Sequence, residues 1–124
     1  MSNFTQNEMK YLRSGLLGRL ATVGRDGMPH IAPVGFSYNS DLDTIDLGGH
    51  DMANTKKFRD VTRSGRAALV VDDIQPLWQP RGIEIRGWAE ALAEPRHLIR
   101  IHPERVVSWG IDTNAFHRKG RSVV

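Results

Sequence analysis

The sequence contains no cysteine. A disulfide framework, a thiolate nucleophile and a zinc site with sulfur ligands are therefore excluded. Long apolar runs are also missing, and residues 1–15 lack the apolar segment of a secretory signal peptide. We expect a cytoplasmic protein that does not enter a membrane.

A large excess of charge of one sign is missing as well. Seventeen Lys and Arg stand against 14 Asp and Glu, a net charge of +3, and both signs alternate along the chain. This argues against a basic stripe for nucleic acid, and we expect no nucleic-acid partner. The high isoelectric point and three tryptophans keep a nucleic-acid-binding barrel as an alternative. A local basic pocket for a phosphorylated small molecule also remains open.

Motifs for a metal site or a nucleophile are absent from the sequence. The five histidines are scattered, and His97 and His102 are five residues apart, so they do not share a helical face. Ser37, Ser64 and Ser108 lack the context of a nucleophile elbow. If the protein is an enzyme, its chemistry must come from an organic cofactor, and we expect neither a metal nor a catalytic side chain.

What the sequence does contain is a series of short β patterns. Gly18–Tyr38 reads as a β-hairpin, with Arg19–Val23 as its first arm and Met28–Tyr38 as its second. Pro29 and Pro33 each remove an amide donor from the second arm, so this arm must be bulged or lie at an edge of the sheet. A flat ligand could approach such a backbone, but an ordinary edge strand protected by proline has the same pattern.

Two helices and four more strands complete the pattern. Thr5 and Glu8 form a capping box for a short N-terminal helix, and a second helix begins at Asn54 or Thr55. Between two of the strands, Ile74–Pro80 is expected as a loop. The further strands are Thr44–Gly49, Ala67–Val71, Gly82–Leu92 and Leu98–Gly110, the last interrupted at Pro103.

Six short, mainly antiparallel strands with short helices predict a mainly β fold, a small closed or split barrel, with an OB-type barrel as the alternative. Residues 1–112 form one domain, and the basic residues 113–124 are expected to be a mobile or partner-bound tail. A barrel of this size is too small to bury several large apolar side chains unaided, so we expect a homodimer. These side chains are Ile83, Ile85, Trp88, Val106 and Trp109.

The start of the second helix is a candidate anion site. The first amides of a helix are unpaired and lie at the positive end of its dipole. Lys56, Lys57 and the Thr55 hydroxyl reinforce this field, and lysines at this end are unfavourable for the helix itself, which points to a ligand. Solvated surface lysines remain the alternative interpretation.

The order of several blocks resembles the pyridoxamine 5′-phosphate oxidase-like split-barrel family. These blocks are LxxxxLGRLATVGRDGMPHIAPVGF, then Thr44–Gly49, NTKKFRD before RAALVVDD, and RGIEIRGWAEAL. The closing RIHPERVVSWGI is similar to small actinobacterial members grouped as coenzyme F420-dependent enzymes. The resemblance covers about residues 5–112. It implies a six-stranded antiparallel split barrel of the FMN-binding type whose core is completed by a second copy.

The resemblance also implies which residues bind the cofactor. The second hairpin arm lies along the ring system, the neighbouring strand ends beside it, and the helix start binds the phosphate-bearing tail. The residues carried over are His30, Ala32, Pro33, Val34, Gly49, His50, Asn54, Thr55, Lys56 and Lys57. Arg81 is added because its corner can reach a partner's cofactor, and Trp109 as an aromatic near the cofactor or the dimer seam. A surface histidine, a solvated arginine and a core tryptophan are the alternatives for His30, Arg81 and Trp109.

These observations favour an oxidoreductase that passes a hydride from reduced coenzyme F420 to a small conjugated acceptor. F420 is preferred to FMN because its longer anionic tail gains from extra cations, and Lys56, Lys57, Arg59 and Arg63 supply them on one segment. The alternatives are an FMN-dependent oxidoreductase and a flavin- or haem-type binding module without turnover.

Overall fold

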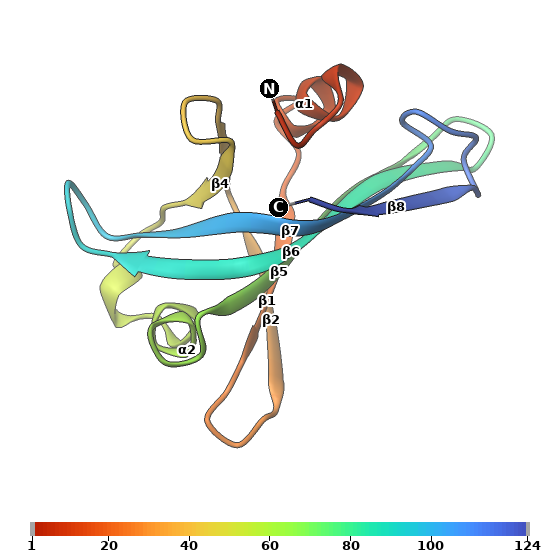
Figure 1. Ribbon diagram of the computed structural model, residues 1–124. Coiled ribbons are helices and arrows are strands. Elements are labelled where there is room, and N and C mark those ends of the chain that lie inside the picture. Colours follow the sequence, from red (N-terminus) through yellow and green to blue (C-terminus); the bar gives the residue numbers. More distant parts are fainter. Residues whose placement is uncertain (1, 124) are drawn as a thin grey trace.

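An antiparallel eight-stranded sheet forms the framework of the computed structural model, which describes residues 2–123 (Figure 1). The strand order is β2-β1-β5-β6-β7-β4-β3, and β8 pairs with β7. The strands are β1 (Gly18–Val23), β2 (Pro29–Val34), β3 (Ser37–Asn39), β4 (Thr44–Leu47), β5 (Arg66–Gln75), β6 (Gln79–Leu92), β7 (Leu98–Trp109) and β8 (Arg118–Ser122). The helices are α1 (Gln6–Leu12), the 3-10 turn η1 (Met52–Asn54) and α2 (Lys56–Ser64).

The link between β2 and β3 requires the sheet to curl. These two strands are its opposite edges, yet only Gly35 and Phe36 separate them in the chain. Three residue steps span at most about 11 Å, so the two edges must approach each other. A sheet with such a link is rolled into a barrel that stays unpaired along this seam. The fold is therefore mainly β with short helices, as the sequence predicts.

The count of six strands was wrong, and two segments account for the difference. The predicted second hairpin arm is divided at Gly35, and Ser37–Asn39 pairs with β4 instead of β1. The tail expected to be mobile or partner-bound includes a strand, because Arg118–Ser122 pairs with Arg105–Trp109 of β7. Its residues carry no apolar alternation, so the pairing was not visible in the sequence.

The loop predicted at Ile74–Pro80 was too long. β5 continues to Gln75 and β6 begins at Gln79, which leaves a three-residue turn between them. Leu77 and Trp78 close this turn with positive φ angles of 66° and 56°, a conformation that few non-glycine residues adopt. Their side chains are 92% and 68% exposed, so this hairpin ends in an apolar tip.

A single chain buries its own barrel core. Ile83, Ile85 and Val106 have no exposed surface, so the argument that they need a second copy was wrong. Trp88 is 45% exposed and Trp109 is half-buried, and only these two retain surface for another molecule. The other side chains at the centre of the core are Leu20, Ile45, Leu47, Leu69, Val71, Ile99 and Ile101.

The helix signals in the sequence are confirmed. Thr5 and Glu8 form a complete capping box at α1. At α2, Thr55 accepts the amide of Phe58 and Gly65 ends the helix with a left-handed backbone. Within residues 2–123, no helix is long and apolar enough to cross a bilayer.

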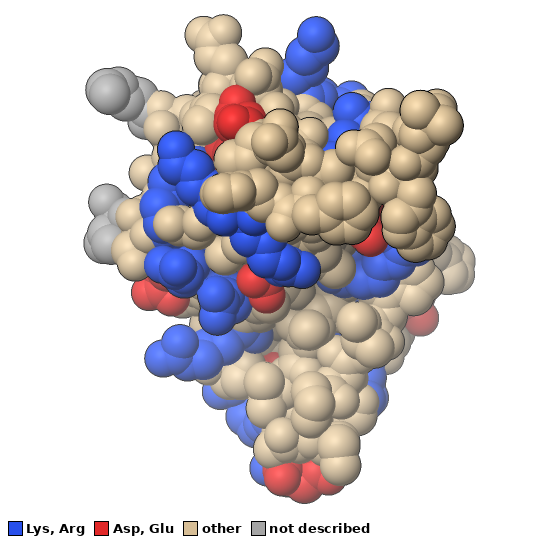
Figure 2. All heavy atoms as spheres, turned by 90° about the vertical axis from the view of Figure 1, so that its right-hand side faces the viewer, with Lys and Arg blue, Asp and Glu red and all other residues tan. Residues whose placement is uncertain are grey.

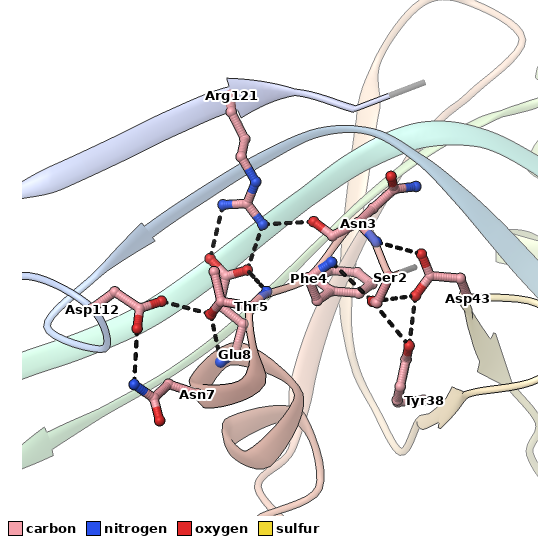
Figure 3. A network of polar contacts seen from close by, with 10 residues as sticks. All are labelled: Ser2, Asn3, Phe4, Thr5, Asn7, Glu8, Tyr38, Asp43, Asp112 and Arg121. Atoms are coloured by element: carbon pink, nitrogen blue, oxygen red, sulfur yellow. Dashed lines mark hydrogen bonds and ion pairs between the residues drawn. The ribbon is translucent and has the colours of Figure 1, made fainter.

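The ends of the described chain are joined through a buried carboxylate. Glu8 in α1 is fully buried, and Arg121 in β8 donates to both of its oxygens at 2.5 and 3.1 Å (Figure 3). Arg121 also donates to the carbonyl of Asn3 at 2.6 Å. Burial of one carboxylate against one guanidinium thus fixes both α1 and β8.

Two aspartates extend this network (Figure 3). Asp112 accepts the hydroxyl of Thr5 at 2.6 Å and the amide of Asn7 at 2.9 Å, and the bond from Thr5 lowers the pKa of Asp112 below its usual value. Asp43, before β4, accepts Ser2 at 2.6 Å and the backbone amide of Asn3 at 2.6 Å. The N-terminal segment is therefore held by three separate parts of the fold.

The surface is unevenly charged. Lys and Arg side chains gather on one side of the molecule, and the β1–β2 hairpin projects away from the body with an acidic side chain at its tip (Figure 2). The same hairpin is the downward projection in Figure 1.

We expect Arg121→Met to lower the free energy of unfolding by about 3–5 kcal/mol, because it leaves the buried Glu8 carboxylate unpaired. Urea unfolding followed by circular dichroism measures this change. Lys119→Met, on the exposed surface of the same strand, is the matched control and should change little. The double variant Glu8→Gln/Arg121→Met should recover part of the loss, and equal losses in Arg121→Met and Lys119→Met would contradict the proposed role of the pair.

Candidate functional site

A hollow of about 240 Å³ lies between the β1–β2 hairpin and the start of α2. It brings together His30 and Ala32 from β2 with Lys56 and Lys57 from α2, four residues that the sequence predicts as ligands. β1 contributes two further side chains because its alternation directs every second residue toward α2. The full lining is Leu20, Thr22, His30, Ile31, Ala32, Lys56 and Lys57.

The start of α2 gives this hollow its positive character. The first intrahelical bond runs from the amide of Arg59 to the carbonyl of Thr55, so the amides of Lys56 and Lys57 precede the helical bonding pattern. Lys57 makes no ion pair within residues 2–123, and Lys56 lies 3.8 Å from Asp60. Unpaired amides and a free ammonium group are the donors that a phosphate or carboxylate requires.

The Thr55 hydroxyl is already engaged. It donates to the carbonyl of Met52 at 2.7 Å and accepts the amide of Phe58 at 3.3 Å. Its neighbour Asn54 donates from its side-chain amide to Asp51 at 2.8 Å, and its carbonyl accepts a bond from Arg59 at 3.0 Å. These contacts shape the turn that leads into α2, and they leave the lysines as the side chains available to an anion.

A buried hydrogen bond fixes α2 against the sheet. Thr22 in β1 and Asp60 in α2 are both buried, and the Thr22 hydroxyl donates to the Asp60 carboxylate at 2.9 Å. Lys56 and Arg63 lie at 3.8 and 4.0 Å from the same carboxylate, and Arg63 also donates to the carbonyl of Val23. Sequence reasoning missed Asp60, although its position four residues after Lys56 is an available signal.

The predicted residues of β2 contribute in different ways. His30 lies over Gly24, where an added Cβ would stand 2.8 Å from its Nε2 atom. Pro33 is exposed on the edge strand, whereas the side chain of Val34 is buried in the core, so Val34 can offer only its backbone to a ligand. The unpaired edge of β2 is accessible to a flat molecule, as its prolines suggest.

A second hollow, of about 500 Å³, is lined in part by the η1 turn, through Met52 and Ala53. Gly49 lines it together with Gly48, and the exposed His50 is adjacent in the chain. Arg96 and His97, from the β6–β7 connection, form its other wall, and sequence reasoning missed both. Two basic residues in the turn Glu94-Pro95-Arg96-His97 were the available signal, but their position opposite η1 depends on the fold.

Arg81 and Trp109 lie elsewhere in the chain. Arg81 donates to Asp73 at 2.7 and 3.1 Å and stacks on the ring of Tyr11, and Trp109 packs under Arg118. Arg81 lines a different hollow, with Tyr11 and Gly110, and Trp109 pairs with Gly82, the residue after Arg81, in the β6–β7 ladder. One copy of the chain therefore does not bring either residue to the hollow beside α2.

The arrangement suits an organic anion with a flat apolar part. Cations and helix amides converge at one end of the hollow, and an open strand edge lies beside it. Within residues 2–123, no group of three or more His, Asp or Glu side chains could hold a metal ion. The donors present thus fit a phosphorylated ring compound, such as a flavin-type cofactor.

Comparison with known proteins identifies the family of this chain. Residues 4–110 match the family model described as pyridoxamine 5′-phosphate oxidase. The chain is 46% identical over 121 residues to the 5a,11a-dehydrotetracycline/5a,11a-dehydrooxytetracycline reductase of Streptomyces rimosus subsp. rimosus, which covers 88% of this chain and 84% of that protein.

Solved structures share the fold at lower identity. A conserved hypothetical protein of Mycobacterium tuberculosis has a TM-score of 0.74 at 22% identity and covers 86% of this chain and 84% of its own. The FAD binding protein of Mycobacterium smegmatis has a TM-score of 0.67 at 23% identity, covering 85% and 93%. A protein named F420 reductase has a TM-score of 0.65 at 21% identity, covering 83% and 98%. From the match over residues 4–110 and the 46% identical relative, the chain belongs to the pyridoxamine 5′-phosphate oxidase family.

Proposed function

We propose that this protein is an oxidoreductase that uses reduced coenzyme F420 to reduce a small conjugated molecule. The observation that carries the proposal is the hollow at the start of α2, with Lys56 and Lys57 beside the open edge of β2, in a chain 46% identical to a reductase. The structural likeness to a protein named F420 reductase supports the choice of cofactor.

The residues of this chain would bind and orient the cofactor. Lys57 and the first amides of α2 would hold the phosphate, and the backbone at Ala32 and Pro33 would lie along the ring. When bound, the deazaflavin supplies the hydride. The protein then contributes position and charge, and no side chain is required as a nucleophile.

The charge argument for F420 needs a different set of cations from the one proposed from sequence. Arg59 and Arg63 both donate to backbone carbonyls, so their guanidinium groups are partly engaged. Lys56 and Lys57 remain, and Arg96 adds a cation in the second hollow, which the η1 turn lines. An anionic tail longer than that of FMN could extend from the first hollow to the second, which favours F420.

The acceptor is proposed to be a polycyclic molecule with a conjugated carbon–carbon double bond. The relative from Streptomyces rimosus is named for dehydrotetracyclines, which carry such a bond between 5a and 11a. Fused planar rings would stack against a cofactor ring lying along β2, and this places the reacting carbon near the hydride.

A second copy of the chain is proposed to complete the site. The first hollow, at about 240 Å³, is smaller than typical ligand sites of roughly 300–1,000 Å³ and would leave a three-ring cofactor exposed. Leu77 and Trp78, at the tip of the β5–β6 hairpin and close in sequence to Arg81, form an exposed apolar surface. In a two-fold dimer, each tip could cover the hollow of the other chain.

We expect light scattering at micromolar concentration to give the mass of a dimer. Trp78→Ser should weaken this dimer and lower cofactor affinity together, because the same tip serves both. Leu42→Ser, at another exposed apolar position, is the control. A stable monomer that still binds cofactor would remove the second copy from the proposal.

We expect apo-protein titrated at fixed ionic strength to bind F420 more tightly than FMN, with reduced F420 supporting reduction of a dehydrotetracycline. Cofactor fluorescence reports binding, and loss of acceptor absorbance reports turnover. Tighter FMN binding, or turnover only with reduced FMN, would reassign the cofactor. Binding without turnover for any conjugated acceptor would instead favour a storage or sensing role.

We expect Lys57→Ala to weaken cofactor binding tenfold or more without loss of fold, because a charged hydrogen bond to phosphate contributes roughly 1.5–3 kcal/mol. Removal of an exposed lysine should cost little stability. Lys10→Ala, in the exposed part of α1, is the matched control. If the dissociation constant at low salt stays the same, the phosphate is held elsewhere, and Arg96→Ala is the next variant to measure.

A further inference from the structure

A separate hollow of about 350 Å³ lies on the opposite face of β1. Successive residues of a strand point to opposite faces, so the side chains of Ala21 and Val23 face away from those of Leu20 and Thr22. Leu20 lines the hollow beside α2, and Thr22, between Ala21 and Val23, borders both hollows. Ala68 in β5, which pairs with Ala21, and Pro29 in β2 complete a floor of small apolar side chains. Its volume lies within the roughly 300–1,000 Å³ of ligand sites.

A β-bulge sets two like charges against each other at the rim of this hollow. The register between β6 and β7 shifts at Gly87, so that Arg86 stands opposite Arg105 and Glu104 is the extra residue. An added Cβ at Gly87 would lie 1.9 Å from the carbonyl oxygen of His102, so the two backbones meet too closely for a side chain. Like charges directly opposite each other destabilise a sheet, and this pair needs a compensating group.

The compensation inside the chain is weak. Arg86 lies 3.5 Å from Glu84 with both side chains partly exposed, and Arg105 reaches Ser122 only at 3.5 Å. Arg66 adds a third guanidinium group from β5, against the single carboxylate of Glu104 at the rim.

The structural arginines of the same chain are paired differently. Arg81, Arg100 and Arg121 each bind a carboxylate through two nitrogens at 3.1 Å or less. That geometry is the strong form of arginine pairing. Within residues 2–123, Arg86 and Arg105 make no such two-nitrogen contact with a carboxylate.

We propose that this hollow binds a small oxyanion with an apolar ring body. A carboxylate or phosphate would bridge Arg86 and Arg105, because a guanidinium group can donate two parallel hydrogen bonds to two oxygens of such an anion. One or two fused rings would cover Ala21, Val23 and Ala68. The site lies on the other face of β1 from the proposed cofactor hollow, and it does not depend on the proposed function.

Calorimetric titration of the full chain at low salt with 1-naphthoate, 1-naphthyl phosphate and the neutral 1-naphthamide tests the proposal. Saturable binding of either anion, and at least tenfold weaker binding of the amide, is the expected result. Binding of only one anion identifies which oxyanion the site takes. Equal affinity for the amide, or no binding of either anion, would overturn the proposal.

Arg105→Gln separates a ligand role from a structural one. It removes the like-charge opposition, so the thermal midpoint should stay the same or rise while naphthoate affinity falls at least tenfold. Arg25→Gln, an exposed arginine in the β1–β2 turn, is the matched control and should leave affinity unchanged. An unchanged affinity in Arg105→Gln, or a midpoint that falls, overturns the assignment. A third outcome also overturns the assignment: the parent protein binds no anion, and Arg105→Gln converts a dimer to a monomer. This face would then join two copies of the chain.

Discussion

The two-residue link between β2 and β3 is the constraint on which the rest of the molecule depends. Since Gly35 and Phe36 join the two edges of one sheet, the sheet must curl. Curling encloses the core around Leu69 and Ile85 and leaves β2 as an unpaired edge. The buried bond between Thr22 and Asp60 then sets α2 beside that edge. Site geometry thus follows from closure of the barrel.

Local patterns predicted much of this fold. The alternation of Gly82–Leu92 gave β6 with Ile83 and Ile85 inside, and the caps at Thr55 and Gly65 gave α2. β8 was missed because it is held by partners distant in sequence, the β7 ladder and Glu8, while its own residues carry no strand pattern. The candidate site follows the same rule. Lys57 could be predicted from its position at a helix start, whereas Arg96 lines its hollow because of contacts between segments distant in sequence.

Arginine serves two different purposes in this chain. At Arg100 and Arg121, a guanidinium group pairs with a carboxylate that is largely removed from water, and the pKa of Arg100 rises because Asp46 accepts its hydrogen bonds. Arg86 and Arg105 line a hollow, and within residues 2–123 neither is held by a carboxylate in this way. A composition rich in arginine therefore indicates neither stability nor binding until the partners of each residue are known.

The pairing of Glu8 with Arg121 has a consequence for motion. Because α1 and β8 share one buried ion pair, neither can open without exposing an unpaired charge on the other. The two ends of the described chain would then exchange their amide hydrogens as a single cooperative unit, in contrast to ends that fray independently. Glu8 and Arg121, 113 residues apart in sequence, would then open together, and slow exchange at the first turn of α1 would report the docking of β8.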